Sequence, residues 1–137
     1  MARVVRPGGV VAACTWDRDG GFELVEVLAG AARSLGAPMP HPGPVMNFRR
    51  ESELAGLWRR SGLTEVETAG IEVQAGYEDV DDYWNGFLGG IGPDSGYVVS
   101  LDDELRTALR EAARRRLGSP GGGFTLSALA WAVRGRR

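Results

Sequence analysis

The stretch from Arg3 to Asp17 (RVVRPGGVVAACTWD) constrains the fold more than any other part of the chain. Pro7 has no backbone N–H to donate, so it ends the helical turn predicted over Met1 to Arg6. The two glycines that follow can adopt positive φ and reverse the chain. Val10 to Thr15 is then an unbroken run of apolar or small residues, which is typical of a strand covered on both faces. The pattern predicts a helix end, a turn and a buried strand.

Helical and extended periodicities alternate along the rest of the chain. Apolar spacing predicts helices over Gly21 to Leu35, from about Glu51, over Asp79 to Leu88 and over Leu101 to Leu117. Alternation predicts strands over Thr64 to Val73, with a bulge or bend at Gly70, and from Phe124 to Val133. The last strand is apolar on both faces, so it is expected in the interior of a sheet. The prolines of Ala37 to Phe48 predict a structured loop.

The composition is that of an ordinary folded domain and excludes several functions. Hydrophobic residues are 43% and charged residues 25% of the chain. A formal net charge of -2 gives no reason to expect nucleic acid or an anionic membrane as partner. All 16 basic residues are Arg, which excludes lysine Schiff-base chemistry. One Cys and one His are too few for a structural zinc site, so no metal is predicted.

The sequence also bears on localisation. No apolar run approaches the roughly 20 residues of a membrane span, and no signal-peptide pattern opens the chain. We therefore expect a cytoplasmic protein with no membrane partner.

Several segments together resemble one known family. The RVVRPGG turn and the strand after it resemble the entry to the fifth strand of class I S-adenosylmethionine (SAM) dependent methyltransferases, of the UbiE-like, type 11 group. Arg50 to Leu63 is similar to the family's helix before strand six, and Thr64 to Val73 to strand six itself. Gly123 to Val133 is similar to the antiparallel seventh strand. The resemblance covers nearly all 137 residues but only the C-terminal half of the family fold.

The resemblance implies a fold. It implies an α/β chain with the C-terminal half of a Rossmann-like sheet, in the strand order five, seven, six, flanked by helices. The seventh strand is antiparallel in that family. Residues 1–137 are then a single partial domain, the acceptor-side half, without the N-terminal half that binds SAM.

The resemblance also implies where the cofactor is held. The family grips SAM with a glycine-rich turn after strand one and an acidic residue after strand two, and both precede the part that this chain resembles. The one internal glycine-rich stretch, Gly89 to Gly92, follows a helical segment, and Pro93 removes an amide donor; it is a cofactor loop, a linker or a lid. We expect the chain alone not to bind SAM.

Candidate substrate-binding residues lie at the end of the first strand, because ligands of open α/β sheets bind beyond the carboxyl ends of the strands. Trp16 can wall off a substrate, or it can pack under the following helix. Asp17 can orient a substrate or accept a proton, or it can cap the turn. No catalytic residue is assigned.

Other candidates are more distant in sequence. His41, the only histidine, can act as a general base from its loop or be a solvated side chain. Tyr83, Trp84 and Phe87 can form a lid over an apolar acceptor, or they can anchor a short helix to the core. Cys14, in the middle of the first strand, is expected to pack in the interior.

The favoured function is a SAM-dependent methyltransferase-family protein that acts on a small-molecule acceptor, with the isolated chain inactive. The alternatives are a non-catalytic module that binds a small molecule and an interaction module derived from the same fold. Without a neighbouring strand, Val10 to Thr15 is an exposed sheet edge. We therefore expect a homodimer, or a complex with a complementary N-terminal half, through this edge.

Overall fold

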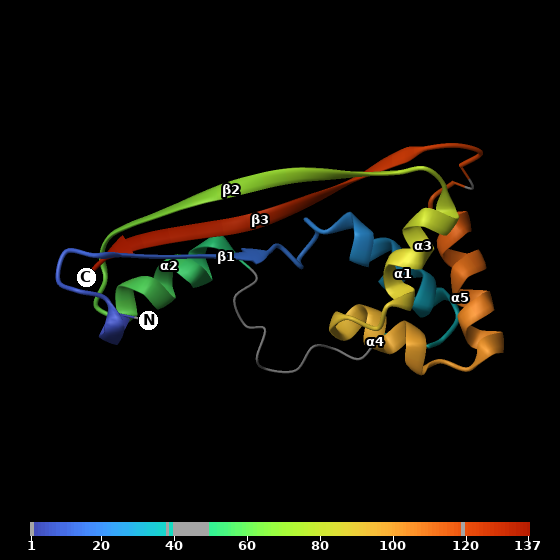
Figure 1. The fold of residues 1–137 in the computed structure, drawn as a ribbon, viewed down its shortest axis with the longest axis horizontal. Coiled ribbons are helices and arrows are strands. Elements are labelled where there is room, and N and C mark those ends of the chain that lie inside the picture. Colours follow the sequence, from blue (N-terminus) through green and yellow to red (C-terminus); the bar gives the residue numbers. More distant parts are fainter. Residues whose placement is uncertain (1, 38, 40–49, 119) are drawn as a thin grey trace. The chain divides into compact units, whose positions relative to one another are not determined.

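The computed structural model describes residues 2–37, 39, 50–118 and 120–137 (Figure 1). A short 3-10 helix, η1, is followed by an α/β chain. The elements are η1 (Ala2–Val4), β1 (Val10–Trp16), α1 (Glu23–Ser34), α2 (Glu51–Arg60), β2 (Thr64–Tyr77), α3 (Val80–Leu88), α4 (Gly92–Ser100), α5 (Asp103–Arg116) and β3 (Phe124–Arg136).

The three strands form one sheet in the order β1-β3-β2. β1 is antiparallel to β3, with Val10 opposite Arg136 and Trp16 opposite Ala130. The order predicted from sequence, with the last strand in the centre and antiparallel, is confirmed. Both neighbouring pairs of strands are antiparallel.

The chain divides into two compact units. The sheet unit comprises Met1–Phe22, Pro44–Val73 and Ser127–Arg137, and the helical unit comprises Glu23–Gly43 and Gln74–Leu126. Both β2 and β3 therefore contribute residues to each unit.

The sheet unit has its core between α2 and one face of the sheet. Its buried residues are Val11, Leu54, Trp58, Leu63 and Val133. The Trp58 indole N–H also donates to the Val11 carbonyl at 3.2 Å, which fastens the helix to β1. A buried hydrogen bond of this kind adds to the stabilisation from apolar burial.

The prediction that the first strand is covered on both faces is wrong. Val11 is buried, but Val10 is 53% exposed, and Cys14 is exposed instead of packed in the interior. Because side chains alternate across a strand, α2 covers only the face that carries Val11 and Ala13.

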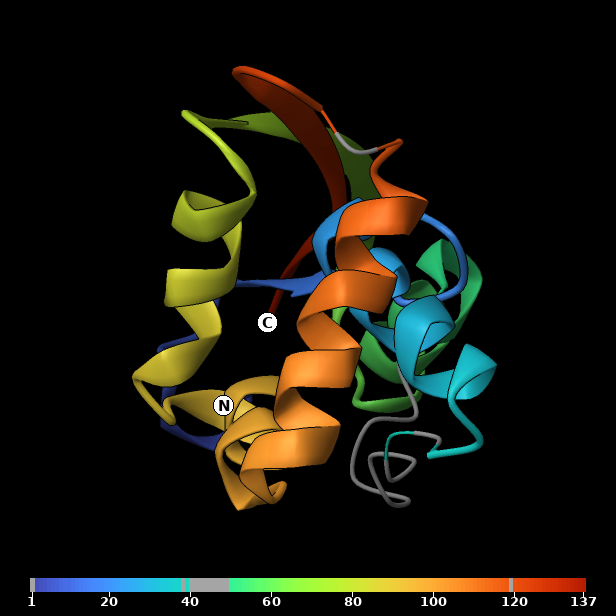
Figure 2. The ribbon, with the colours of Figure 1, turned by 90° about the vertical axis from the view of Figure 1, so that its right-hand side faces the viewer.

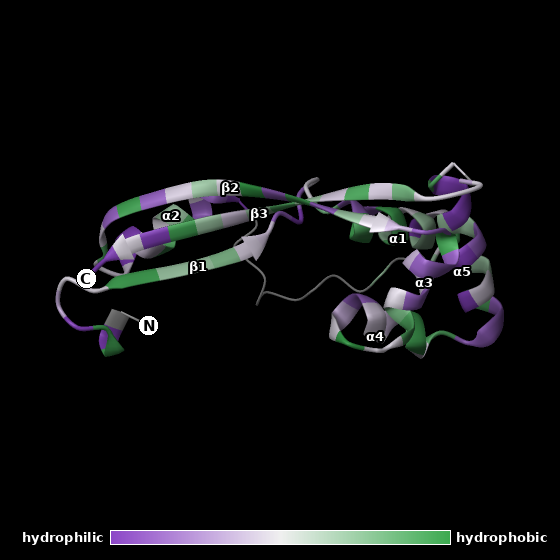
Figure 3. Ribbon diagram, turned by 45° about the horizontal axis from the view of Figure 1, so that its top comes forward, coloured by the Kyte–Doolittle hydropathy of each residue, from purple (hydrophilic) through white to green (hydrophobic). Residues whose placement is uncertain are grey.

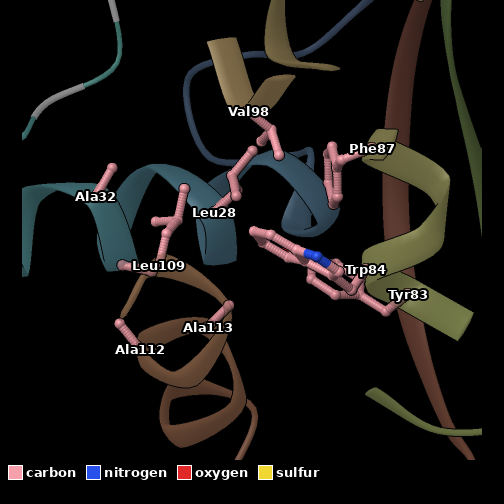
Figure 4. Close-up of a cluster of buried hydrophobic side chains, with 10 residues drawn as sticks. Leu28, Ala32, Tyr83, Trp84, Phe87, Val98, Leu109, Ala112 and Ala113 are labelled. Carbon is pink, nitrogen blue, oxygen red and sulfur yellow. The ribbon is translucent and has the colours of Figure 1, made fainter. Parts of the chain in front are cut away.

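The helical unit has a larger core, drawn in Figure 4. Leu28 and Ala32 of α1 lie against Leu109 and Ala112 of α5, and α1 and α5 run side by side (Figure 2). The aromatic side chains of α3 and Val98 of α4 complete this core.

One helix differs from the sequence prediction. The sequence predicted no helix between Leu88 and Leu101, but α4 begins at Gly92, at the end of the glycine-rich stretch, and buries Val98 completely. Pro93 lies in the first turn of α4, where a missing N–H costs nothing because that group has no partner within the helix.

Gly70 does not interrupt β2, which continues to Tyr77. A Cβ atom at this position would lie 3.2 Å from Leu129 and 3.3 Å from Trp131, so the glycine leaves room for side chains of β3. The positive φ in this strand is at Glu65, with φ 48°.

Candidate functional site

The carboxyl end of β1 carries a pair of stacked aromatic rings. Trp16 and Phe22 have ring centroids 4.9 Å apart and an interplanar angle of 19°. The chain returns to the sheet between them: Asp17 N donates to Leu129 O at 2.8 Å, and Leu129 N donates to Gly21 O. The turn between the two rings is thus fixed by backbone hydrogen bonds to β3.

Gly21 is required at this turn by close packing. A Cβ atom on Gly21 would lie 2.8 Å from the Asp17 Cβ atom and 2.9 Å from the Leu129 Cβ atom. Any larger residue would push the turn away from β3, and with it the ring of Phe22. The glycine therefore positions one half of the aromatic pair.

The aromatic pair is accessible and has a cation beside it. Trp16 is 42% exposed. The guanidinium carbon of Arg18 lies 5.9 Å from the centre of the Phe22 ring, within the range of a cation–π interaction. The end of β1 thus presents a flat apolar surface with a positive charge near it.

The carboxylate of Asp17 shapes the turn. Its Oδ1 accepts a hydrogen bond from the backbone N–H of Asp19 at 2.9 Å, as in an Asx turn. The Asp19 carboxylate in turn accepts from the Arg50 guanidinium at 2.9 Å, and it raises the pKa of that guanidinium above its usual value. The hydrogen bond to Asp19 N shows that Asp17 caps the turn, which is one of the two roles that the sequence allowed for it.

The aromatic pair borders an uncovered apolar surface, which we call the open face. It is the side of the sheet away from α2. Its exposed apolar residues on the two outer strands are Val10, Ala12, Cys14, Trp16, Ala69, Ile71 and Val73, and near Val10 the same side also carries the ion pairs Glu65–Arg136 and Glu67–Arg134. Figure 3 shows green to white along β1, against alternating purple and green bands on β2. Large exposed apolar patches are typical of binding surfaces.

Tyr83 and Trp84 lie elsewhere, in the core of the helical unit (Figure 4). Tyr83 is fully buried and Trp84 is 5% exposed. The Tyr83 hydroxyl donates to Leu24 O at 3.0 Å, and burial raises the pKa of that hydroxyl. Phe87 packs edge-on against Tyr83. These contacts anchor α3 to the core, as the second of the two sequence readings proposed.

The structure therefore brings Trp16 and Asp17 together in one unit, and Tyr83 and Trp84 together in the other. His41 lies outside the described residues. The sequence reasoning missed Phe22 as the partner of Trp16. The available signal was a pair of aromatic residues on either side of a short turn rich in Asp and Gly.

The glycine-rich stretch links α3 to α4. Gly90 and Gly92 have positive φ, and Ile91 between them is 88% exposed. The stretch thus joins two helices, whereas a nucleotide-binding turn joins a strand to a helix. Within residues 2–37, 39, 50–118 and 120–137, no three His, Cys, Asp or Glu side chains gather as a metal site.

Comparison of the chain with models of protein families and with curated proteins gives no match to either. Among the described helices, none has the length and apolar character needed to cross a membrane.

Proposed function

We propose that this chain is the acceptor-side half of a class I SAM-dependent methyltransferase domain that acts on a small molecule. The observation that supports this most is the sheet order β1-β3-β2, with an antiparallel strand in the centre. It is the order that the RVVRPGG resemblance implies for strands five, seven and six. The stacked rings of Trp16 and Phe22 at the end of β1 also support the proposal, because they offer an apolar acceptor a flat surface.

The proposed acceptor site is the stack of Trp16 and Phe22. A planar apolar acceptor would lie against the exposed indole, because aromatic rings stack favourably at separations of this size. The site lies beyond the carboxyl end of β1, where open α/β sheets bind their ligands.

The described residues do not fit SAM itself. The glycine-rich stretch lies between two helices, and its Ile91 side chain is exposed. SAM carries an activated methyl group, and a methyltransferase mainly has to align that group with the acceptor. We therefore assign to this chain the task of holding and orienting the acceptor, and assign the cofactor to a complementary half.

The alternative function is an interaction module, and the observation that favours it is the exposed edge of β1. The two functions are compatible, because the acceptor surface and the strand edge use different atoms of β1. The stack uses the Trp16 side chain, whereas an edge uses backbone groups.

The acceptor site can be tested by NMR of the tryptophan indoles. The chain has four Trp residues, and of these Trp58 and Trp84 are buried and the Trp131 indole nitrogen is enclosed. We expect planar hydroxy-aromatic probes, beginning with 2-naphthol, to shift the Trp16 indole signal and leave that of Trp84 unchanged.

The matched control is Trp16→Leu, which should abolish binding of 2-naphthol and leave the fold intact, because the side chain is partly exposed. Binding that persists in Trp16→Leu, or probes that perturb only the Trp84 signal, would place the acceptor elsewhere and count against the proposal.

A further inference from the structure

The helical unit contains a hollow at the place where α5 ends beside the first turns of α1. α5 ends at Arg116, and Gly118, with φ 78°, turns the chain away from the helix axis. The chain returns at Phe124, where β3 begins. Side chains of these three elements border a hollow of about 380 Å³. This volume lies within the usual range of small-molecule sites, which is about 300–1,000 Å³.

One part of this hollow is apolar and is held in place by the core of the helical unit. Its side chains all pack against that core; they are Val27, Leu117, Phe124 and Leu126. The ring of Phe124 also stacks on that of Tyr77, with the ring centroids 5.3 Å apart and an interplanar angle of 25°. An apolar group bound here would leave water and contact side chains that are already ordered.

Arg116 brings a positive charge to the hollow. Its guanidinium lies against α1 at Gly30, because a Cβ atom on Gly30 would overlap the guanidinium and lie 2.6 Å from its Nη2 atom. Gly30 therefore makes room for this side chain on the surface of α1. Among the described residues, Arg116 has no ion-pair or side-chain hydrogen-bond partner. Its N–H groups, which form a fork that suits a carboxylate, are available to a ligand.

A negative charge lies on the same side of α1. Glu26 precedes Gly30 by one helical turn, so the two residues share a face of the helix. Glu26 lines the hollow and is exposed, and within the part of the chain that the structure describes it has no ion-pair partner either. The hollow thus offers two opposite charges that do not neutralise each other. An ion pair between exposed side chains contributes little to stability, so a ligand can contact both charges at little cost.

We propose that this hollow binds a free α-amino acid with an apolar side chain. The carboxylate of the amino acid accepts hydrogen bonds from the guanidinium of Arg116. Its ammonium group donates to the carboxylate of Glu26, and its side chain lies against Leu117 and Phe124. The three parts of such a ligand match the three kinds of surface that the hollow presents.

The charges of the hollow select a zwitterion over related ligands. The lining carries the carboxylates of Glu23 and Glu26 and the guanidinium of Arg116. An apolar carboxylic acid without an ammonium group is repelled by the two carboxylates. An apolar amine without a carboxylate leaves Arg116 without a partner and adds a like charge beside it. Each of these ligands also loses a charge-assisted hydrogen bond.

This inference goes beyond the proposed function, because it concerns a second ligand in the other unit. The hollow is built from residues of the helical unit, whereas Trp16 and Phe22 belong to the sheet unit. Binding of the amino acid requires neither SAM nor a methyl acceptor.

A series of matched ligands tests the site by methyl NMR of the whole chain. L-leucine should shift the methyl signals of Val27, Leu117 and Leu126, with a dissociation constant on the order of 1 mM or below. The methyl signals of Leu54, in the core of the sheet unit, should not move. The amine 3-methylbutylamine lacks only the carboxylate of leucine, 4-methylpentanoate lacks only the ammonium group, and glycine lacks the side chain. Each should bind at least about tenfold more weakly than L-leucine.

Two neighbouring arginines provide a matched pair of variants. Arg115 and Arg116 are both exposed at the end of α5, and Arg116 is the one that lines the hollow. Arg116→Ala should weaken the binding of L-leucine at least about tenfold, because the carboxylate loses its charged donor. Arg115→Ala should change it by less than about twofold.

Gly30→Ala tests the position of the guanidinium without changing a charge. The added methyl group overlaps the guanidinium and displaces Arg116. Alanine is a better helix former than glycine, so circular dichroism should show that α1 is retained. The variant should bind L-leucine at least about threefold more weakly, and Gly30→Ala should cause no further loss when it is combined with Arg116→Ala.

Three results would overturn the proposal. They are unchanged methyl signals of Val27, Leu117 and Leu126 in a folded chain at about 10 mM L-leucine, binding of the amine or the acid as tight as that of L-leucine, or equal effects of the two arginine variants. None of these readouts involves Trp16. Failure of the amino-acid site is therefore distinguishable from failure of the acceptor site.

Discussion

Two tryptophans of the sheet unit illustrate how position decides the role of a residue. Trp58 is 6% exposed, and its indole N–H has a backbone acceptor in Val11. Trp16 is 42% exposed, and its ring contacts only one aromatic neighbour among the described residues. A buried tryptophan with a hydrogen-bond partner stabilises a fold, whereas an exposed ring on a fixed turn is available to a ligand. We therefore attribute packing to Trp58 and propose ligand binding for Trp16.

A pH prediction at the residue scale concerns Tyr83. Burial raises the pKa of its hydroxyl above the ordinary value of 10.0. The folded state therefore holds the proton more tightly than the unfolded state. Loss of this proton therefore favours the unfolded state. The free energy of unfolding keeps its full value below about pH 10 and falls as the pH rises above it, by up to about 1.4 kcal/mol per pH unit. Urea unfolding between pH 8 and pH 11 should show this decline in the free energy of unfolding.

The control for this prediction is Tyr83→Phe. The variant should lose about 1 kcal/mol at pH 7, because the hydrogen bond to Leu24 O is removed. Its stability should then fall less steeply above pH 10 than that of the unchanged chain. Equal slopes for the two proteins would show that Tyr83 is not the titrating group.

At the scale of elements, side-chain caps determine where the helices begin. The Asp79 carboxylate accepts from Asp82 N at the start of α3, and the Asp102 carboxylate accepts from Leu105 N at the start of α5, both at 2.8 Å. The start of α2 is different, because Arg50 occupies the cap position and the Glu53 carboxylate accepts from its backbone N–H. In each case a carboxylate accepts a hydrogen bond from a backbone N–H group that has no partner within the helix.

The Asp102 cap gives a prediction for α5. Asp102→Ala should reduce the free energy of unfolding by about 0.5–2 kcal/mol, because the Leu105 N–H loses its acceptor. Asp102→Asn keeps an acceptor oxygen at the same place and should be nearly neutral. Thermal and urea unfolding of both variants checks this, and equal losses would mean that charge, and not the hydrogen bond, stabilises the helix start.

Much of the element order could be predicted from the sequence. The apolar residues on both faces of the last strand correctly indicated the central position of β3, and helical spacing located α1, α3 and α5. The start of α4 was missed, because Gly92 and Pro93 resemble a break until the first-turn position of the proline is known. The exposure of Cys14 was missed because a short apolar run does not show how many faces of a strand are covered.

At the scale of the whole molecule, the chain builds two cores and leaves one sheet face open. Residues 1–137, which the sequence predicts to be one partial domain, contain two compact units, the sheet unit and the helical unit. Sequence periodicity assigns residues to elements but does not show which elements share a core. The pairing of Trp16 with Phe22 was likewise beyond prediction, since it depends on the backbone bonds between the turn and Leu129.

We propose that this chain holds a methyl acceptor and does not hold the methyl donor. Calorimetric titration of the folded chain with SAM is the most direct test of this proposal. We predict no heat of binding up to millimolar SAM, while 2-naphthol still shifts the Trp16 indole signal. Micromolar binding of SAM to the chain alone would contradict the proposal, because it would require a cofactor site within the described residues or across two copies of them.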